Sequence, residues 1–421
     1  MTATRDDGSE RGIHCGRQIS LTGGGSSAVL PAMRILWVLM WMVALTAGAQ
    51  EPASTDAGAQ DKATPATTPG QPAITYIEKD MWAPAPQAFP NGLDVLEVYA
   101  DRPGRHPLVV LTHGTSAVEQ EREHVTPWSQ LNQARWFARR GYVVFVVVRK
   151  GYGRSGGERD GNRGGCHSRN GSFEEAGEAS AEDLKAVIKW AQKLPEVDGT
   201  TVVSAGVSTG GFAQAALVAD PPKELKAAIS FAGGRGGDGH EHNCDLDGLV
   251  AAFGAFGKGA RKHGTVPMLW IYSENDHWFP PEMARKFEAA YVKGGGVEQF
   301  VLAPPDGDDG HHLYGHTAVW SETVTAFLKA HDLLPLGDVV LPGPEPPKIP
   351  PPAGLNERGG EAWAHYLLGA PFKAFAVNGQ GEWGMAMAGF DQSIADGEAI
   401  DRCKHAGGGA GNCVIVARTA K

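Results

Sequence analysis

Short apolar runs alternate with amphipathic stretches between residues 74 and 334. The runs are rich in Val, Ile and Leu, which predicts buried strands at 108–112, 142–148, 201–205, 227–232, 268–272 and 298–302. Apolar residues at helical spacing predict helices over 128–140, 173–194, 209–219, 281–292 and 316–331. Strands of this kind alternating with helices are typical of a mostly parallel sheet covered on both faces. The pattern therefore predicts an α/β fold.

Two glycine-rich stretches, 151–172 and 233–265, interrupt this alternation and are predicted to be long loops. The first contains Gly151, Gly153 and Gly156 in the spacing G-x-G-x-x-G, which opens a helix in dinucleotide-binding folds. Here further glycines and charged residues follow, and they do not favour an early helix start. We interpret the motif as an ordinary loop.

An apolar segment near the start of the chain, residues 35–45, is too short to span a bilayer comfortably. Arg34 precedes it, and small residues up to Ala49 follow it, as signal peptidase requires. We predict cleavage after Ala49, export to the periplasm or the extracellular space, and no stable membrane insertion afterwards. A single membrane anchor is the alternative. Residues 1–32 are polar and unlike a signal peptide, so translation is expected to begin at Met33.

Composition divides the chain into five parts. The upstream extension with the signal peptide is followed by a disordered linker rich in Ala, Thr and Pro, the α/β domain, a stiffer Pro-rich linker and a small terminal module. The predicted bounds are 1–49, 50–73, 74–334, 335–360 and 361–421.

The terminal module shows the pattern of a hairpin, a helix and a last strand, at 372–378, 382–388, 393–403 and 413–418. Trp383 with the following glycine, a helix that ends at Cys403 and a strand that starts at Cys413 resemble a small domain of unknown function in secreted bacterial proteins. The resemblance implies no catalysis. We interpret the module as a disulfide-closed appendage that could bind a partner.

The sharpest motif is Gly206-Val-Ser208-Thr-Gly210, which matches G-x-S-x-G. It lies between a predicted strand and a predicted helix, and this context makes the motif specific. Small residues fit two positions before and after the serine because the turn is tight. Ser208 is therefore the candidate nucleophile, and it needs a base to take its proton.

The acid and the base should follow the serine in the order Ser, acid, His. Asp276 comes after the strand 268–272, at the ligand-binding edge of an open α/β sheet. Glu274 competes, but Asp276 follows an asparagine in a favourable turn. His311, His312 and His316 share the loop after the next strand. His311 is preferred, because it ends the flexible stretch and its neighbour would face the opposite way.

The oxyanion hole needs two backbone N–H groups. One is expected from Thr209, the residue after the nucleophile, and the other from Thr115, in the loop after the strand 108–112. His113 precedes the serine in the chain, so its position does not suit the base. We interpret it as a loop-shaping residue.

These motifs resemble the dienelactone-hydrolase-like branch of the α/β-hydrolases over roughly residues 75–334. The residues that carry the resemblance are His113-Gly114, the elbow at Ser208, Glu274-Asn275-Asp276 and Asp309-Gly310-His311. It implies the α/β-hydrolase fold for this domain, with a small α+β module after it. In the branch an Asp-Gly-His sequence carries the base, which supports His311. The true dienelactone hydrolases use a cysteine nucleophile, so Ser208 indicates a general esterase instead.

The four cysteines after the signal segment suggest disulfides in an exported chain. Cys403 and Cys413 flank a short Gly-rich loop, so their Cα atoms come within bridging reach. Cys166 and Cys244 lie in the two Gly-rich loops, which leave the same edge of the sheet. We predict the pairs Cys166–Cys244 and Cys403–Cys413. Zinc binding is the alternative, although the spacings are unlike CxxC pairs.

Charge argues weakly against a nucleic-acid partner, because 38 Lys and Arg against 48 Asp and Glu leave a formal net charge of −10. The histidines near 311 with Asp306, Asp308 and Asp309 could form a metal site. A serine nucleophile needs no metal, so no metal or cofactor is expected.

The sequence thus predicts a secreted serine hydrolase that cleaves small-molecule carboxylic esters through an acyl-enzyme. A serine peptidase of the same fold and a non-catalytic binding protein on a hydrolase scaffold are the alternatives. The acyl and alcohol specificity and the oligomeric state stay open.

Overall fold

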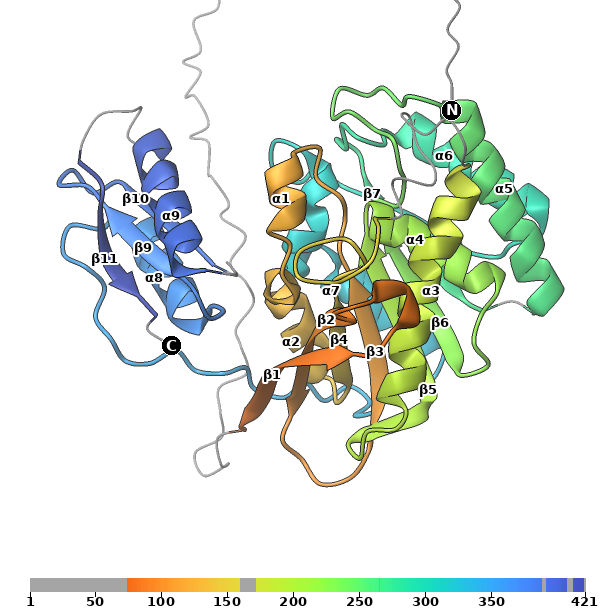
Figure 1. Cartoon of the computed structure of the whole chain (residues 1–421), viewed down its shortest axis with the longest axis horizontal. Helices are drawn as coiled ribbons and strands as arrows, with labels where there is room; N and C mark the ends of the chain where they lie inside the picture. The colour runs from red at the N-terminus through yellow and green to blue at the C-terminus, as the bar shows by residue number, and fades with distance from the viewer. Residues whose placement is uncertain (1–73, 160–171, 265, 388–390, 407–411, 420–421) are drawn as a thin grey trace, which may run out of the picture. The chain divides into compact units, whose positions relative to one another are not determined.

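A computed structural model of the chain describes residues 74–159, 172–264, 266–387, 391–406 and 412–419 (Figure 1). The predicted signal peptide, the first linker and Cys166 lie outside these ranges. Among the helices of the described ranges, none is both long and apolar enough to cross a membrane.

The larger sheet has eight strands in the order β1-β2-β4-β3-β5-β6-β7-β8. Strand β2 is antiparallel to its neighbours β1 and β4, and every pair from β4 across to β8 is parallel. The strands are β1 Tyr76–Ala83, β2 Leu93–Ala100, β3 His106–Thr112, β4 Val143–Val147, β5 Val197–Val207, β6 Leu225–Phe231, β7 Met268–Ser273 and β8 Gln299–Ala303. The predicted mostly parallel sheet is confirmed.

Helices cover both faces of this sheet. They are α1 Glu119–Glu123, α2 Leu131–Ala138, α3 Phe173–Ala191, α4 Thr209–Ala219, α5 Leu246–His263, α6 Pro281–Gly294 and α7 Thr317–Ala330. The strand order, with β5 leading directly into α4, is that of the α/β-hydrolase fold, so the predicted fold class is confirmed.

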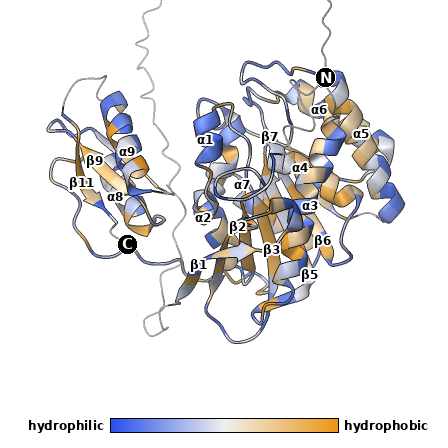
Figure 2. Cartoon of the chain, viewed as in Figure 1, coloured by the Kyte–Doolittle hydropathy of each residue, from blue (hydrophilic) through white to orange (hydrophobic). Residues whose placement is uncertain are grey.

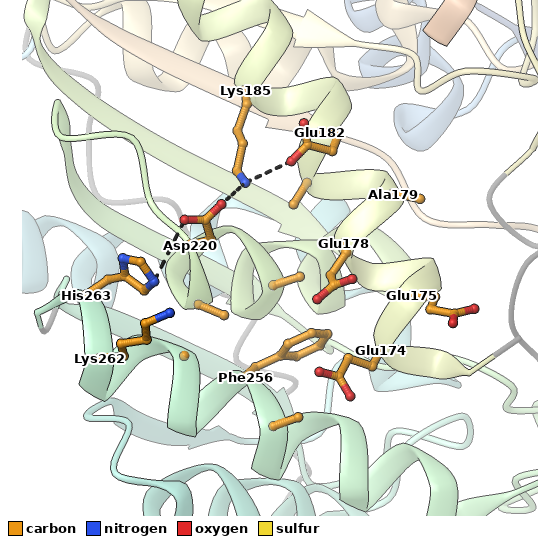
Figure 3. A pocket seen from close by; sticks show the side chains of 15 residues that line it. Glu174, Glu175, Glu178, Ala179, Glu182, Lys185, Asp220, Phe256, Lys262 and His263 are labelled. Carbon is orange, nitrogen blue, oxygen red and sulfur yellow. Dashed lines mark hydrogen bonds and ion pairs between the residues drawn. The ribbon is translucent and has the colours of Figure 1, made fainter.

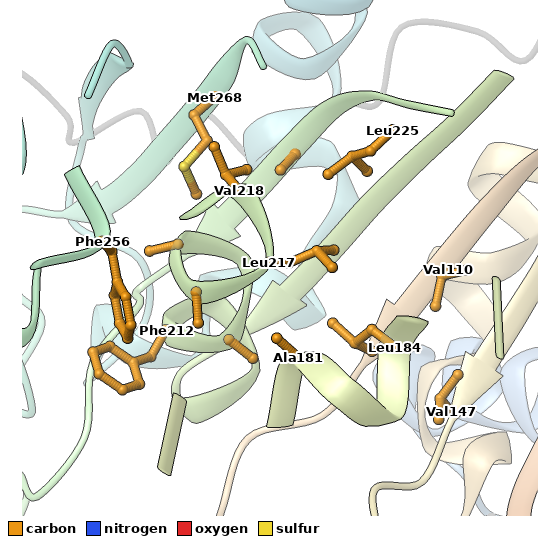
Figure 4. Close-up of a cluster of buried hydrophobic side chains, with 14 of the residues drawn as sticks. Val110, Val147, Ala181, Leu184, Phe212, Leu217, Val218, Leu225, Phe256 and Met268 are labelled. Carbon is orange, nitrogen blue, oxygen red and sulfur yellow. The ribbon is translucent and has the colours of Figure 1, made fainter. Parts of the chain in front are cut away.

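Alternate residues of a strand point to opposite faces of the sheet, and the core follows this rule. Leu108 and Val110 of β3 belong to the cluster that includes residues of α3, α4, α5 and α6. Figure 4 shows Val110 in this cluster with Leu184 of α3 and Leu217 of α4. Val109 of β3 packs in the cluster that includes residues of α2 and α7. In Figure 2 the strands of this sheet are mostly hydrophobic, whereas α1 is hydrophilic.

Helix α5 contradicts the prediction that all of 233–265 is a loop, because Leu246–His263 is helical. The side chain of Asp245 caps it by accepting a hydrogen bond from the N–H of Gly248 at 3.0 Å. A Cβ at Gly257 would collide with the carbonyl oxygen of Tyr291 on α6. Glycines of this segment therefore allow two helices to pack closely, and their number misleads a prediction from composition.

The terminal module has a three-stranded antiparallel sheet in the order β10-β9-β11. Its strands are β9 Ala374–Val377, β10 Trp383–Ala386 and β11 Val414–Arg418, and its helices are α8 Glu357–Leu368 and α9 Gln392–Ala406. The predicted hairpin, helix and last strand are found. Helix α8 is not predicted by the sequence pattern, and it begins inside the stretch taken as linker.

The predicted Cys403–Cys413 disulfide is present, and its Cα atoms lie 6.1 Å apart. Cys244, in the loop between β6 and α5, is also disulfide-bonded. Its predicted partner Cys166 falls outside the described residues, so the Cys166–Cys244 pair stays a prediction.

Candidate active site

Ser208 occupies the sharp turn between β5 and α4, with φ 56° and ψ −120°. An L-residue rarely adopts positive φ, so the surrounding structure must enforce this conformation. The backbone N–H of Ser208 donates to the carbonyl of Phe231 at 2.9 Å, and its carbonyl accepts from Phe212 and Gly234 at 2.9 and 3.1 Å. The turn thus positions the serine at the carboxyl edge of the sheet.

The two glycines of the motif are sterically required. A Cβ at Gly206 would lie 2.5 Å from the carbonyl oxygen of Gly210. A Cβ at Gly210 would in turn lie 2.5 Å from the carbonyl oxygen of His113. Both distances are far below van der Waals contact, so any side chain would open the turn that presents Ser208.

The structure brings His311 and Asp276 together at the same edge. Nδ1 of His311 lies 3.1 Å from both carboxylate oxygens of Asp276. Oδ1 of Asp276 also accepts the N–H groups of Trp278 and Phe279, each at 2.8 Å. Asp276 is 1 % exposed and His311 is 7 % exposed. A buried carboxylate held in this way favours the tautomer that carries its proton on Nδ1 and leaves Nε2 as the base.

Asp309 holds the backbone of this histidine. Its Oδ1 accepts the N–H of His311 at 3.0 Å and the N–H of His277 at 3.1 Å. Partial burial raises the pKa of Asp309, but the two N–H donors outweigh it, and the pKa lies below its usual value. Asp309 therefore stays ionised and joins the acid loop to the base loop.

Neighbouring backbone and aromatic contacts connect the nucleophile to the base. The N–H of Gly234 donates to the carbonyl of Ser208, and a Cβ at Gly234 would lie 2.5 Å from the ring of Phe279. That ring lies edge-on to His311, with 5.5 Å between centroids. In the described part of the chain no hydrogen bond joins the hydroxyl of Ser208 to His311. Such bonds are often long before substrate binds.

The segment after β3 lies against the nucleophile. A Cβ at Gly114 would be 3.0 Å from Cβ of Ser208 and 3.5 Å from its Oγ. The hydroxyls of Thr115 and Thr209 lie 2.8 Å apart. Their backbone N–H groups make no hydrogen bond within the described residues. The two amides that the sequence predicts for an oxyanion hole are therefore not used by other hydrogen bonds of the described residues.

One protein-family model matches part of the larger domain. The family model of X-Pro dipeptidyl-peptidases (S15 family) matches residues 92–258. This chain is a hydrolase of the α/β-hydrolase fold. The match includes the elbow at Ser208 but ends before Asp276 and His311, and no curated protein matches the chain.

Solved structures similar to this hydrolase belong to esterases and related enzymes. A thermophilic esterase from Thermogutta terrifontis with bound propionate is 19 % identical, covers 61 % of this chain and 96 % of its own, and has a TM-score of 0.42. The Pyrococcus furiosus esterase Pf2001 is 16 % identical, with 61 and 93 % coverage and a TM-score of 0.41. A "Putative Dienelactone Hydrolase" from Klebsiella pneumoniae is 15 % identical, with 61 and 99 % coverage and a TM-score of 0.40.

Three competing candidates for the acid and the base, Glu274, His312 and His316, are exposed. Glu274 lies two residues before the buried Asp276, and His312 directly follows the buried His311, yet both side chains are exposed. His316 is exposed as well and pairs with Asp306 at 2.6 Å. His113 is buried, accepts the N–H of Arg149 at 3.1 Å and lies 2.6 Å from the carbonyl of Gly114. It shapes the loop as expected.

Sequence reasoning missed several residues that surround the site. The indole of Trp278 stacks on the imidazole of His311, with 5.4 Å between centroids. Arg149 and Tyr152 lie buried behind the segment that carries Thr115. Arg149 had one available signal, because a cation directly after a buried strand is unusual.

The motif at Gly151 forms a turn, and no helix begins there among the described residues. The hydroxyl of Ser155 donates to the carbonyl of Val148 at 2.7 Å and accepts the N–H of Asp94 at 2.8 Å, which folds the loop back on β2 and β4. In the described ranges no group of three His, Cys, Asp or Glu residues could hold a metal ion.

Figure 3 shows a separate hollow between α3, α4 and α5. Lys185 pairs there with Glu182 at 2.9 Å and with Asp220 at 2.7 Å. The hollow includes the last turn of the 11-residue helix α4, about 16 Å along the helix from Ser208. The residues that line this hollow include none of the candidate catalytic or oxyanion residues.

Proposed function

We propose that this hydrolase cleaves carboxylic esters with Ser208 as nucleophile, His311 as general base and Asp276 as the orienting acid. The observation that carries the proposal is the buried His311–Asp276 pair at the same sheet edge as the strained serine turn. Each of the three residues follows a different parallel strand, β5, β7 and β8. Convergence of three separate segments on a nucleophile, a base and an acid is hard to explain by packing alone.

The roles follow from the contacts. Nε2 of His311 takes the proton of Ser208 as Oγ attacks the ester carbonyl carbon, and the backbone amides of Thr115 and Thr209 stabilise the oxyanion. Asp276 stabilises the imidazolium that forms. His311 then donates the proton to the leaving alcohol, and a water molecule activated by the same imidazole hydrolyses the acyl-enzyme.

A serine peptidase is the second candidate, favoured by the match to the X-Pro dipeptidyl-peptidase family model. An enzyme that removes a dipeptide must enclose the amino end of its substrate. Between β6 and β7 the described chain contains only a loop and α5, without a separate cap domain. We therefore propose an ester substrate first. Export is part of this proposal as well. Its sole support is the sequence of the predicted signal segment.

Replacement of Ser208 tests the proposal. We expect Ser208→Ala to lose p-nitrophenyl acetate hydrolysis by several orders of magnitude while keeping the parent circular dichroism spectrum, because triad loss removes the covalent route. The parent should react with a fluorophosphonate probe, and the variant should not. Hydrolysis of Gly-Pro-p-nitroanilide in preference to an ester panel would establish the peptidase alternative. Parent activity in Ser208→Ala would refute the assignment.

A further inference from the structure

A wholly buried arginine lies behind the two predicted oxyanion amides. Arg149 follows β4 and is 0 % exposed. Its Nη2 donates to the hydroxyl of Thr209 at 2.8 Å and lies 3.5 Å from that of Thr115. Its Nη1 donates to the hydroxyl of Thr112 at 3.0 Å and to the carbonyl of His113. One guanidinium thus holds the end of β3, the loop after it and the start of α4.

The hydroxyls around this guanidinium form a chain. Thr209 and Thr115 are 2.8 Å apart, and Thr115 lies 2.8 Å from the hydroxyl of Tyr152. A guanidinium only donates hydrogen bonds, so the oxygen of Thr209 must accept from Arg149. Its own proton can then be donated to Thr115. The cation therefore fixes both threonine side chains, and with them the backbone that carries the two predicted oxyanion amides.

We propose that Arg149 is a positioning residue for the oxyanion hole. It holds the amides of Thr115 and Thr209 in place and sets a positive charge behind them. Burying a guanidinium is costly, and an apolar side chain could fill the same space more cheaply. A fixed charge in a site shielded from water acts more strongly on a developing oxyanion than it would in solvent. This inference rests on the proposed function and names a further residue for it.

Arg149→Met and Arg149→Lys test the role, with Arg140→Met as the matched control. Arg140 is also a buried arginine, but its guanidinium stacks on Trp136 on α2, 3.5 Å from the ring centroid. We expect Arg149→Met to lower kcat for p-nitrophenyl acetate by about 10²–10³-fold with KM changed only a few-fold, since loss of an oxyanion donor has this effect. Arg149→Lys should recover part of the rate. Lysine keeps the positive charge but lacks the planar, forked set of N–H donors of the guanidinium. Arg140→Met should keep the parent kcat.

Inhibitor binding separates this role from a structural one. An alkylboronic acid forms an anionic tetrahedral adduct with the serine, so its Ki should rise in parallel with the fall in kcat. Binding of the neutral product alcohol should not change. If Arg149→Met does not fold, Thr209→Val offers a second test. It removes the hydroxyl that accepts from Arg149 and leaves the guanidinium charge in place, so it should lower kcat and preserve KM.

The outcomes are distinct. If the parent is active and Arg149→Met is equally active, the inference about Arg149 is contradicted but the proposed function is not. The same holds if Arg149→Met raises KM and leaves kcat unchanged. An equal loss in Arg140→Met would show a general effect of buried arginines. A parent that neither hydrolyses any ester nor reacts with a fluorophosphonate contradicts the proposed function itself.

Discussion

His311 is held by contacts on several sides. Asp276 holds its Nδ1, Asp309 holds its backbone N–H, and the rings of Trp278 and Phe279 pack against its imidazole. Its neighbour His312 is exposed. Adjacent residues of identical type therefore have opposite environments, and only one of them can face a buried carboxylate.

At the residue scale, we expect His311→Ala to lower kcat for p-nitrophenyl acetate by roughly 10⁴-fold or more, because the serine then has no base. His312→Ala should stay within a few-fold of the parent, and it serves as the matched control. Steady-state kinetics of both variants decide the assignment. An inactive His312→Ala beside an active His311→Ala would reverse it.

Strand β2 carries a carboxyl group in an unfavourable place. Glu97 is only 3 % exposed, stands opposite Lys79 of β1 in the register, and its Oε1 has no hydrogen-bond partner among the described residues. Burial, together with a hydrogen bond and repulsion from Glu196, raises the pKa of Glu97 from 4.5 to about 8. The folded protein therefore keeps this carboxyl group protonated at neutral pH.

At the element scale, stability should respond to this group. The unfolded glutamate releases its proton near its ordinary pKa of 4.5, whereas the folded one keeps it up to about pH 8. Between these values the folded state binds more protons, so the free energy of unfolding falls as pH rises, by on the order of a few kcal/mol. We expect Glu97→Gln to remove this slope and to raise the melting temperature at pH 8.

Urea unfolding at pH 5 and at pH 8 measures the effect. Glu123→Gln is a suitable control, because this glutamate lies exposed on α1. Equal slopes in the parent and in Glu97→Gln would show that the carboxyl group of Glu97 titrates normally.

At the scale of the whole molecule, the described residues form two sheets with separate cores. The proposed catalytic residues all come from the eight-stranded sheet and its loops. One core cluster of the terminal module consists largely of small side chains, among them Ala376, Ala399 and Cys403. A second cluster of the module packs aromatic side chains, among them Trp363 and Phe375. Because both clusters are small, the disulfide to Cys413 should contribute a large share of the stability of the module.

At this scale we expect the double variant Cys403→Ser, Cys413→Ser to make residues 357–419 sensitive to proteolysis, since the lost cross-link is worth about 2–4 kcal/mol. Its kcat for p-nitrophenyl acetate should equal that of the parent. Limited trypsin digestion with mass spectrometry, beside an activity assay, measures both. A module as resistant as the parent, or a loss of esterase activity, would contradict this division of roles.

The sequence by itself determined the strands from β3 to β8, the elbow and the order of the proposed catalytic residues. Buried parallel strands need continuous apolar runs, and the serine turn tolerates only glycine at Gly206 and Gly210, so both leave local marks. Helix α5 was hidden because its glycines resemble those of a loop. Strands β1 and β2 were hidden because their sequences mix apolar and charged residues.

Only the tertiary structure decided which of several similar side chains is buried at the edge of the sheet. Asp276 and Glu274 are two residues apart, and His311 and His312 are adjacent, yet one of each pair is buried and the other exposed. Arg149 acquired its proposed role from contacts with segments near residues 112 and 209. Such contacts join residues far apart in the chain, and no local pattern records them.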